Sequence, residues 1–234
     1  AIKEMNKLTD DITSVKVLPS IYPQGGEKVL IYNCTGKIVP EGKLPIDVGV
    51  IVINCTTLAI IANYIKTGVP LVEKLITVDG SAVKEPKNVI VPIGTSMSDV
   101  FNFCGGFKEE PKKVLYGGPM MGIAVPTLDL PVLKTTNAII ALSKKDAVLP
   151  EPTQCIKCGK CVDACPLNLM PLDYARGLEL KDYALLEKRK VNLCMECGCC
   201  SYVCPANRPL LQINWEAKSY LKKYAASKKE GGNK

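Results

Sequence analysis

The sequence contains no histidine among its 234 residues. Histidine is the side chain that most often acts as a general base near neutral pH, and it is a common zinc ligand. Its absence excludes Cys/His zinc sites and any catalysis that depends on an imidazole. Chemistry in this chain must therefore depend on sulfur, carboxylates, the backbone and bound cofactors.

Long apolar runs are also lacking, although 47% of the residues are hydrophobic. A membrane-spanning helix needs roughly 18 or more consecutive apolar residues. The longest candidate, VGVIVINCTTLAIIANYI at residues 48–65, is interrupted by Asn54, Thr56 and Thr57. This run is better interpreted as a buried strand followed by a helix than as a membrane span.

Aromatic residues make up only 6% of the chain, and the basic residues are not interleaved with them. Nucleic-acid binding is therefore not expected. The net charge is +7, and residues 218–234 alone carry six lysines and one glutamate. This basic segment is either a solvated, fraying helix or a docking element for an acidic partner or an anionic membrane surface.

Cysteine, in contrast, is abundant, with 12 in the chain. Eight of them form two runs of the pattern C-x2-C-x2-C-x3-C-P, namely CIKCGKCVDACP at 155–166 and CMECGCCSYVCP at 194–205. A chain of this size does not need disulfides for stability, so clustered thiols indicate metal binding in a reducing compartment. We expect that compartment to be the cytoplasm.

Three thiolates within seven residues can surround one face of a cubane cluster, but the fourth ligand must come from elsewhere. In two-cluster ferredoxins the last cysteine of each run ligates the other cluster. We therefore predict two [4Fe–4S] clusters with crossed ligands. One is expected to be bound by Cys155, Cys158, Cys161 and Cys204, and the other by Cys194, Cys197, Cys200 and Cys165.

A pair of structural zinc sites is the alternative interpretation of the two runs. Zinc usually takes two separated cysteine pairs per site, rather than three cysteines in one heptad and a fourth before a proline. Cys199 is an extra cysteine that falls off the spacing, and its role stays open. The isolated cysteines, Cys34, Cys55 and Cys104, are expected to be buried free thiols, and Cys55 is the one whose position in a turn would allow redox chemistry.

Composition divides the chain into four segments, with an α+β fold overall. Residues 1–66 contain a Gly/Pro-rich loop, a predicted strand at 47–54 and a predicted helix at 56–68, capped by Thr56 or Thr57. Residues 67–145 contain several short strands around one helix that begins after Ser96 or Ser98, which suggests a β-grasp module. Residues 150–212 form the cysteine domain, with helical sequence between its two halves, and 213–234 form the basic tail. The strand–turn–helix layout at 47–68 would let a helix N-terminus hold an anion such as a phosphate.

Four sequence features occur together and in order: YPQGGEK at 22–28, GKLPIDVGVIVINCTTLA at 42–59, YGGPMMG at 116–122, and the two cysteine runs. In this combination the chain resembles the RnfC-type subunits of ion-pumping ferredoxin:NAD oxidoreductases, which are related to the flavoprotein subunit of respiratory complex I. The resemblance covers nearly the whole chain. It implies the C-terminal part of a flavin- and NADH-binding α/β domain, a β-grasp soluble-ligand-binding module and a dicluster ferredoxin-like domain.

The same resemblance implies cofactor-binding residues in the first segment. Gly26 and Glu27 match a Gly-Glu pair near the flavin and nicotinamide, and Lys28 stands where complex I has a second glutamate. Asn54 and Thr57 match the Asn-x-x-Thr turn that holds FMN. The glycine-rich loop of the family, G-x-G-G-A-G-F-P-T, is absent from this sequence, so FMN binding would require a missing upstream region. We therefore expect a C-terminal fragment of a longer protein, or a version without flavin binding, and no NADH oxidation by this chain alone.

The leading functional hypothesis is an electron-transfer subunit that passes electrons between NADH or flavin and ferredoxin or a partner complex. Its partners would be subunits of a membrane ion-pumping complex, with a peripheral location on the inner face of the membrane and NADH bound by the full-length protein. A second hypothesis is a soluble carrier that feeds a dedicated reductase, such as a cobalamin or proline reductase. A third is a non-catalytic binding scaffold in which the metal is structural.

Overall fold

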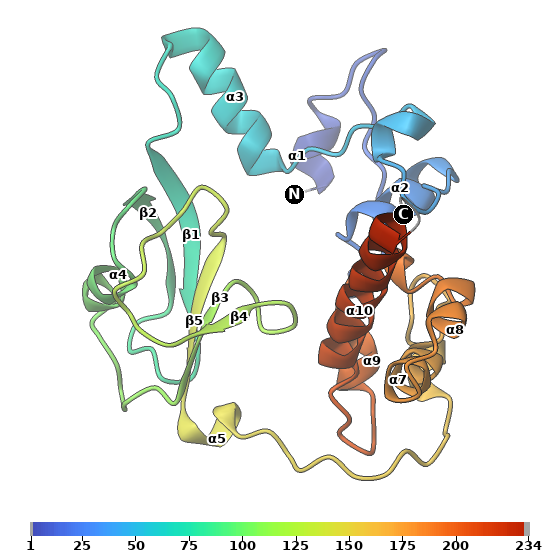
Figure 1. The fold of residues 1–234 in the computed structure, drawn as a ribbon. Coiled ribbons are helices and arrows are strands. Elements are labelled where there is room, and N and C mark those ends of the chain that lie inside the picture. Colours follow the sequence, from blue (N-terminus) through green and yellow to red (C-terminus); the bar gives the residue numbers. More distant parts are fainter. Residues whose placement is uncertain (1, 232–234) are drawn as a thin grey trace. The chain divides into compact units, whose positions relative to one another are not determined.

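A computed structural model describes residues 2–231, so residue 1 and residues 232–234 of the predicted first and last segments lie outside the described range. The chain forms two compact units (Figure 1). The first unit combines residues 1–52 with residues 153–234, and the second contains residues 53–152. The N-terminal segment and the cysteine region, which are far apart in sequence, therefore belong to one structural unit.

The second unit is built on a mixed sheet of five strands in the order β2-β1-β5-β3-β4. The strands are β1 (Glu73–Asp79), β2 (Lys87–Pro92), β3 (Lys113–Tyr116), β4 (Ile123–Val125) and β5 (Ala138–Leu142). Only β1 and β5 run parallel, with Thr77 opposite Ala138, and the other neighbours are antiparallel. The unit also contains α3 (Cys55–Thr67), α4 (Met97–Phe103) and α5 (Lys144–Ala147).

The core of this unit lies between the sheet and α4. Side chains alternate along a strand, and Ile76 and Val78 of β1 are buried while their neighbours are exposed or half-buried. Helix α4 contributes Met97, Val100 and Phe101 to the same core. Ser96 caps this helix as predicted, because its hydroxyl oxygen accepts the backbone N–H of Asp99 at 3.1 Å.

The predicted strand at 47–54 is not formed. A short 3-10 helix, η1 (Pro45–Val48), occupies its start, and the residues that follow have no regular structure. The described sheet pairs strands only from Glu73 onward, so nothing there accepts the backbone hydrogen bonds of this run. Its apolar side chains are accordingly exposed or half-buried, with Ile51 exposed by 71%. A β-branched run becomes a strand only where a neighbouring strand pairs with it.

The predicted helix after this run does form, as α3. Gly68 ends it with a φ of 71°, a left-handed conformation that suits glycine. Its N-cap is Asn54, and not Thr56 or Thr57 as expected from the sequence. The side-chain oxygen of Asn54 accepts the backbone N–H of Thr56 at 2.9 Å, which leaves both threonines inside the first turn.

The first unit is mainly helical. Its N-terminal part contributes α1 (Ile2–Asn6), α2 (Glu27–Thr35) and η1, and its cysteine region contributes α6 (Lys160–Asp163), α7 (Pro171–Glu179), α8 (Tyr183–Lys188), η2 (Val191–Leu193), α9 (Cys199–Tyr202) and α10 (Leu210–Gly231). Helices α7, α8 and α10 pack around Leu169, Tyr174, Leu186, Val191, Ala217 and Leu221. The helical sequence predicted between the cysteine runs is thus found as α7 and α8.

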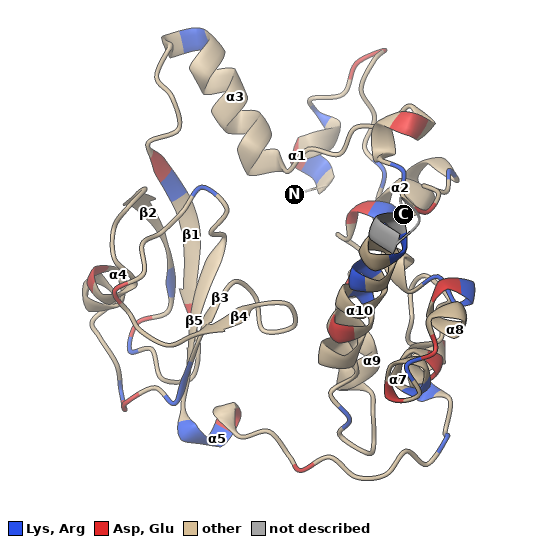
Figure 2. Cartoon of the chain, viewed as in Figure 1, with Lys and Arg blue, Asp and Glu red and all other residues tan. Residues whose placement is uncertain are grey.

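The C-terminal segment is continuous with the cysteine region. Helix α10 runs through the boundary predicted near residue 212, and it buries Asn214, Ala217 and Leu221 against the rest of the unit. Lysines are concentrated toward its C-terminal end (Figure 2). None of the described helices is long and apolar enough to cross a membrane.

The glycines of the second unit offer a test of its packing. Gly80 has a φ of 120°, and a Cβ atom added there would lie 2.1 Å from the carbonyl oxygen of Ala141. Gly94 has a φ of 101° but no atom within 4 Å of its added Cβ. Gly94→Ala should cost about 1 kcal/mol for its backbone conformation alone, and Gly80→Ala should cost about 2 kcal/mol more because β5 must shift.

Urea titration monitored by amide hydrogen exchange in β1 and β5 measures both free energies of unfolding. Equal losses in the two variants would contradict the close packing of Gly80 against β5.

Candidate iron–sulfur site

The two cysteine runs repeat in backbone conformation as well as in sequence, with a shift of 39 residues. Lys157 and Glu196 occupy equivalent positions and have φ values of 57° and 61°. Gly159 and Gly198 both have a φ of 80°, and each precedes a short helix, α6 or α9. The pair Asn168 and Asn207 follows the prolines, again in the left-handed region. Left-handed non-glycine residues each cost about 1–2 kcal/mol, so two matched non-glycine pairs beside the glycine pair indicate a loop shape that the site requires.

This loop shape turns backbone N–H groups toward sulfur. The N–H of Lys157 donates to the Cys155 sulfur at 3.4 Å, and that of Leu169 donates to the Cys165 sulfur at 3.3 Å. In the second run burial raises the pKa of the Cys194 thiol, and the equivalent hydrogen bond from the N–H of Glu196 acts in the opposite direction. Alternating right- and left-handed residues form concavities of N–H groups that bind anions, and such concavities occur in many iron–sulfur sites.

One cavity, here the first-run cavity, is lined by the sulfur-bearing residues Cys155, Cys158, Cys161 and Cys204. Apolar residues, among them Ile156, Leu172 and Leu210, also line the cavity, together with the charged residues Lys157 and Arg208.

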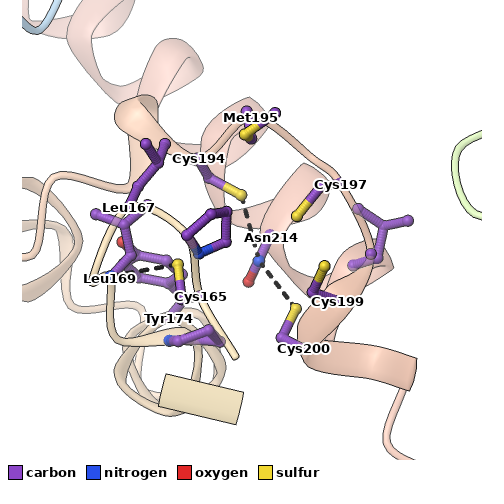
Figure 3. Close-up of a pocket in the computed structure, with 14 residues that line it drawn as sticks. Cys165, Leu167, Leu169, Tyr174, Cys194, Met195, Cys197, Cys199, Cys200 and Asn214 are labelled. Carbon is purple, nitrogen blue, oxygen red and sulfur yellow. Dashed lines mark hydrogen bonds between the residues drawn. The ribbon is translucent and has the colours of Figure 1, made fainter. Parts of the chain in front are cut away.

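The other, here the second-run cavity, is lined by Cys165, Cys194, Cys197 and Cys200, together with Cys199 (Figure 3). The two cavities are similar in size. Leu167, Leu169 and Tyr174 approach from the segment that follows the first run.

The structure therefore brings together the two predicted sets of four cysteines, each with its last member from the other run. Burial raises the pKa of Cys161, and the neighbouring Cys155 and Cys204 raise it further. Burial also raises the pKa of Cys200 to about 12, with Cys194, Cys197 and Cys165 adding to the effect. Such thiols become thiolates only when a cation offsets their mutual repulsion and desolvation.

The arrangement of these sulfurs fits a cluster inside each cavity. Within residues 2–231, no group of three or more cysteine, aspartate or glutamate side chains converges as the ligands of a single metal ion would. The assignment of the eight cysteines as ligands stays a prediction, and the four-thiol lining and inward N–H groups of each cavity support it.

The remaining cysteines differ in their surroundings. Cys199 is buried in the second-run cavity, and burial together with a hydrogen bond to Cys197 raises its pKa to about 12. Cys104 is a buried thiol in the core of the second unit, as expected. Cys34 and Cys55 are exposed, so the expectation that they are buried was wrong.

Two residues of α10 next to the second-run cavity were not predicted from the sequence. Asn214 directs its side-chain nitrogen toward the sulfurs of Cys194 and Cys200. Lys218, one turn later, donates to the carbonyl oxygen of Cys194 at 2.6 Å and forms an ion pair with Glu196 at 2.5 Å. A signal was present in the sequence, because Asn214 interrupts the apolar positions Leu210, Leu211, Ala217 and Leu221 of a helix that begins soon after the last cysteine.

The segment that carries Gly26 and Glu27 packs against the second run. The hydroxyl of Tyr22 donates to the carbonyl oxygen of Cys197 at 2.7 Å. Gly26, the N-cap of α2, is so close to Met195 that an added Cβ would lie 2.0 Å from its methyl carbon. A neighbouring cavity is lined by Tyr22, Lys28 and Cys165, among others.

The other two predicted flavin residues belong to the second unit. Asn54 is the N-cap of α3, and Thr57 lies in its first turn. The side chain of Asn54 is engaged in capping its own helix. That these residues share one flavin site with Gly26 and Glu27 stays a prediction.

The chain matches three protein-family models. Residues 1–63 match the Nuo51 FMN-binding domain, residues 75–124 the SLBB domain, and residues 154–208 the 4Fe-4S dicluster domain. The α+β fold and the presence of a dicluster domain follow from these matches together with the structure.

Among curated proteins, the C-subunit of the ion-translocating oxidoreductase complex of Rhodobacter capsulatus is 39% identical to this chain. The alignment covers 94% of this chain. The chain belongs to the RnfC-type family. Other members of the family include the C-subunit of the proton-translocating ferredoxin:NAD(+) oxidoreductase complex of Clostridium ljungdahlii, 47% identical over 73% of the chain, and that of the Na(+)-translocating complex of Acetobacterium woodii, 46% identical over 71%. The chain spans 43%, 38% and 38% of these three relatives, respectively, or about two fifths of their length.

The crossed arrangement of the RnfC-type dicluster domain leads to a test. Cys165→Ser should abolish the cluster of the second run first and leave that of the first run, because Cys165 lines the second-run cavity. Iron content should fall to about half that of the unaltered chain, as measured by iron and sulfide analysis and by EPR. Cys34→Ser, which alters an exposed thiol of the same unit, is the matched control. Loss of the first-run cluster alone would show that the crossed assignment is wrong.

Proposed function

We propose that this chain is the iron–sulfur part of an RnfC-type subunit that passes single electrons between a flavin or NADH and ferredoxin or a partner complex. The observation that carries this proposal is the pair of matched cavities, each lined by three cysteines of one run and the last cysteine of the other. Thiols in this arrangement suit two [4Fe–4S] clusters. Such clusters accept and donate one electron at a time.

The chain's own residues bind the clusters and set their surroundings. Four thiolates hold each one, and the inward N–H groups of the left-handed loops stabilise the negative charge on sulfur. Apolar side chains, such as Leu172 and Leu210 on one side and Leu167 and Leu211 on the other, exclude water. Exclusion of water and hydrogen bonds to sulfur are the two means by which a protein adjusts the potential of such a site.

The local packing supports an order for the two sites. The segment Tyr22–Lys28, which carries the predicted flavin residues Gly26 and Glu27, contacts the second-run loop at Cys197 and Met195. Electrons from the flavin side would therefore enter at the second-run cavity. Cys161 and Cys165, which belong to different cavities, are joined through the single short helix α6. This gives a compact route onward to the first-run cavity.

The flavin and NADH sites would be completed in the whole protein. The residues Gly26, Glu27, Asn54 and Thr57 come from a segment that matches the Nuo51 FMN-binding domain. The chain spans about two fifths of its relatives, and we propose that the remaining parts supply the glycine-rich loop. NADH oxidation would then require that full length.

The proposed partners follow from the names of the relatives, which are subunits of ion-translocating complexes. We propose that the chain is peripheral to such a membrane complex, on its cytoplasmic side, with other subunits or ferredoxin as electron partners. A dedicated soluble reductase is the competing partner. Co-purification distinguishes the two, because a soluble reductase recovered in place of the membrane complex would contradict the membrane assignment.

Anaerobic purification tests the electron-transfer function itself. The chain should be brown and contain about eight iron atoms and about eight sulfide ions, as two [4Fe–4S] clusters require. Reduction with dithionite should give EPR signals of two interacting S = 1/2 centres. A colourless protein with bound zinc and no EPR signal would support the structural scaffold and remove the proposal.

A further inference from the structure

One polar side chain in the first unit is almost completely buried at the second-run cavity. Asn214 is 1% exposed and lies on α10, with its side-chain nitrogen 3.5 Å from the Cys194 sulfur and 3.9 Å from the Cys200 sulfur (Figure 3). Both sulfurs belong to the predicted ligand set of this cavity. A thiolate accepts hydrogen bonds and cannot donate them, so it favours the orientation in which the amide nitrogen faces sulfur.

The amide of Asn214 is an unfavourable choice for stability alone. Its carbonyl oxygen is buried and has no hydrogen-bond partner among the described residues. An unpaired buried polar atom costs about 1–3 kcal/mol, and replacement by an apolar group of the same shape can be neutral or stabilising. Leucine would fit the apolar pattern of the helix, as Leu210 and Leu211 show. The reason for an asparagine here is therefore its two N–H donors.

The internal repeat provides a comparison within the same molecule. The 39-residue shift that relates the cysteine runs also relates α7 to α10, since Pro171 and Leu210 begin the two helices. Leu172 lines the first-run cavity as Leu211 lines the second. The counterpart of Asn214 is Ala175, which has no donor and is not among the residues that line the first-run cavity. In that cavity Arg208 instead supplies a positive charge, at the position of Leu169 in the other half.

We propose that Asn214 is a positioning residue that raises the reduction potential of the second-run cluster by donating its amide hydrogens to the thiolates of Cys194 and Cys200. The inference rests on the proposed function, because it requires the cluster. Reduction adds negative charge that is shared with the ligand sulfurs, and donors to those sulfurs stabilise the reduced form more than the oxidised form. Lys218, one turn later on α10, also raises the reduction potential through its positive charge, but its ion pair with Glu196 offsets part of that effect.

Asn214→Leu in the cluster-loaded chain tests this assignment. The variant keeps the shape of the side chain and removes both donors. The reduced-to-oxidised ratio of the second-run cluster at a fixed solution potential should fall about tenfold, which is 59 mV for a one-electron couple. The midpoint of the first-run cluster should stay unchanged. Potentiometric titration followed by EPR measures both midpoints, and no activity assay is needed.

Two further substitutions separate the hydrogen bonds from packing. Asn214→Asp has nearly the same shape but places a negative charge beside the thiolates, so its midpoint should fall by more than that of Asn214→Leu. Asn214→Gln retains an amide and should recover part of the loss. Leu221→Val is the matched control, because Leu221 is a buried apolar residue of the same helix that does not line the second-run cavity. At the same fixed solution potential, the reduced-to-oxidised ratio of its second-run cluster should stay within about twofold of that of the unaltered chain.

The proposal is overturned if Asn214→Leu leaves the second-run midpoint unchanged, if both midpoints shift alike, or if Leu221→Val causes an equal fall. Failure of the proposed function would be seen separately. The unaltered chain would then lack iron and sulfide before any substitution is made, and this inference would fail with it. Two clusters with normal midpoints in every variant would overturn the role of Asn214 alone.

Discussion

The fold of the first unit depends on the exchange of one cysteine between the two runs. Cys165 follows α6 out of the first run and ends in the cavity of the second, and Cys204 makes the reverse crossing. Four thiols in one place repel one another once ionised, and the N–H groups of the left-handed loops offset only part of that repulsion. The helices α7, α8 and α10 pack around this exchange with a core of their own, centred on Tyr174 and Leu186. Cys165 and Cys194 pack directly against this core, so the core stabilises the loops that carry the cysteines.

The cysteine region could be predicted from the sequence almost completely, because the spacing of the ligands is itself the structural constraint. Three cysteines in a heptad and a fourth before proline leave few ways to surround a cluster. The short strands of the second unit were predicted for a similar reason, since their alternating apolar residues and turn glycines are local signals. Asn214 was not predicted, because the effect of a side chain from α10 on a distant loop depends on tertiary packing.

The run at 47–54 shows where local signals fail. Its β-branched residues indicate a strand, but a strand is stabilised by pairing, and the described sheet has no edge for it. Helix α3, directly after it, has the right length and the expected C-cap but no buried residue. The same segment matches the FMN-binding domain model. Propensity thus identified two elements for which the described residues of each unit show no packing partner, and of these only the helix, with its own hydrogen bonds and caps, is formed.

The shared ligands also bear on how the two halves of the cysteine region can diverge. Because each cavity takes its fourth thiol from the other half, neither half can lose its last cysteine without damage to the predicted cluster of the other half. Duplicated sequences usually diverge, but these two loops share ligands, and they still have the same backbone conformation at Lys157 and Glu196. Variation is found between the cysteines, as at Lys157 and Glu196, and in the flanking helices, where Ala175 and Asn214 differ. The two ligand sets are therefore alike, whereas the residues around them differ. A single chain can in this way give two chemically identical cofactors different electronic properties.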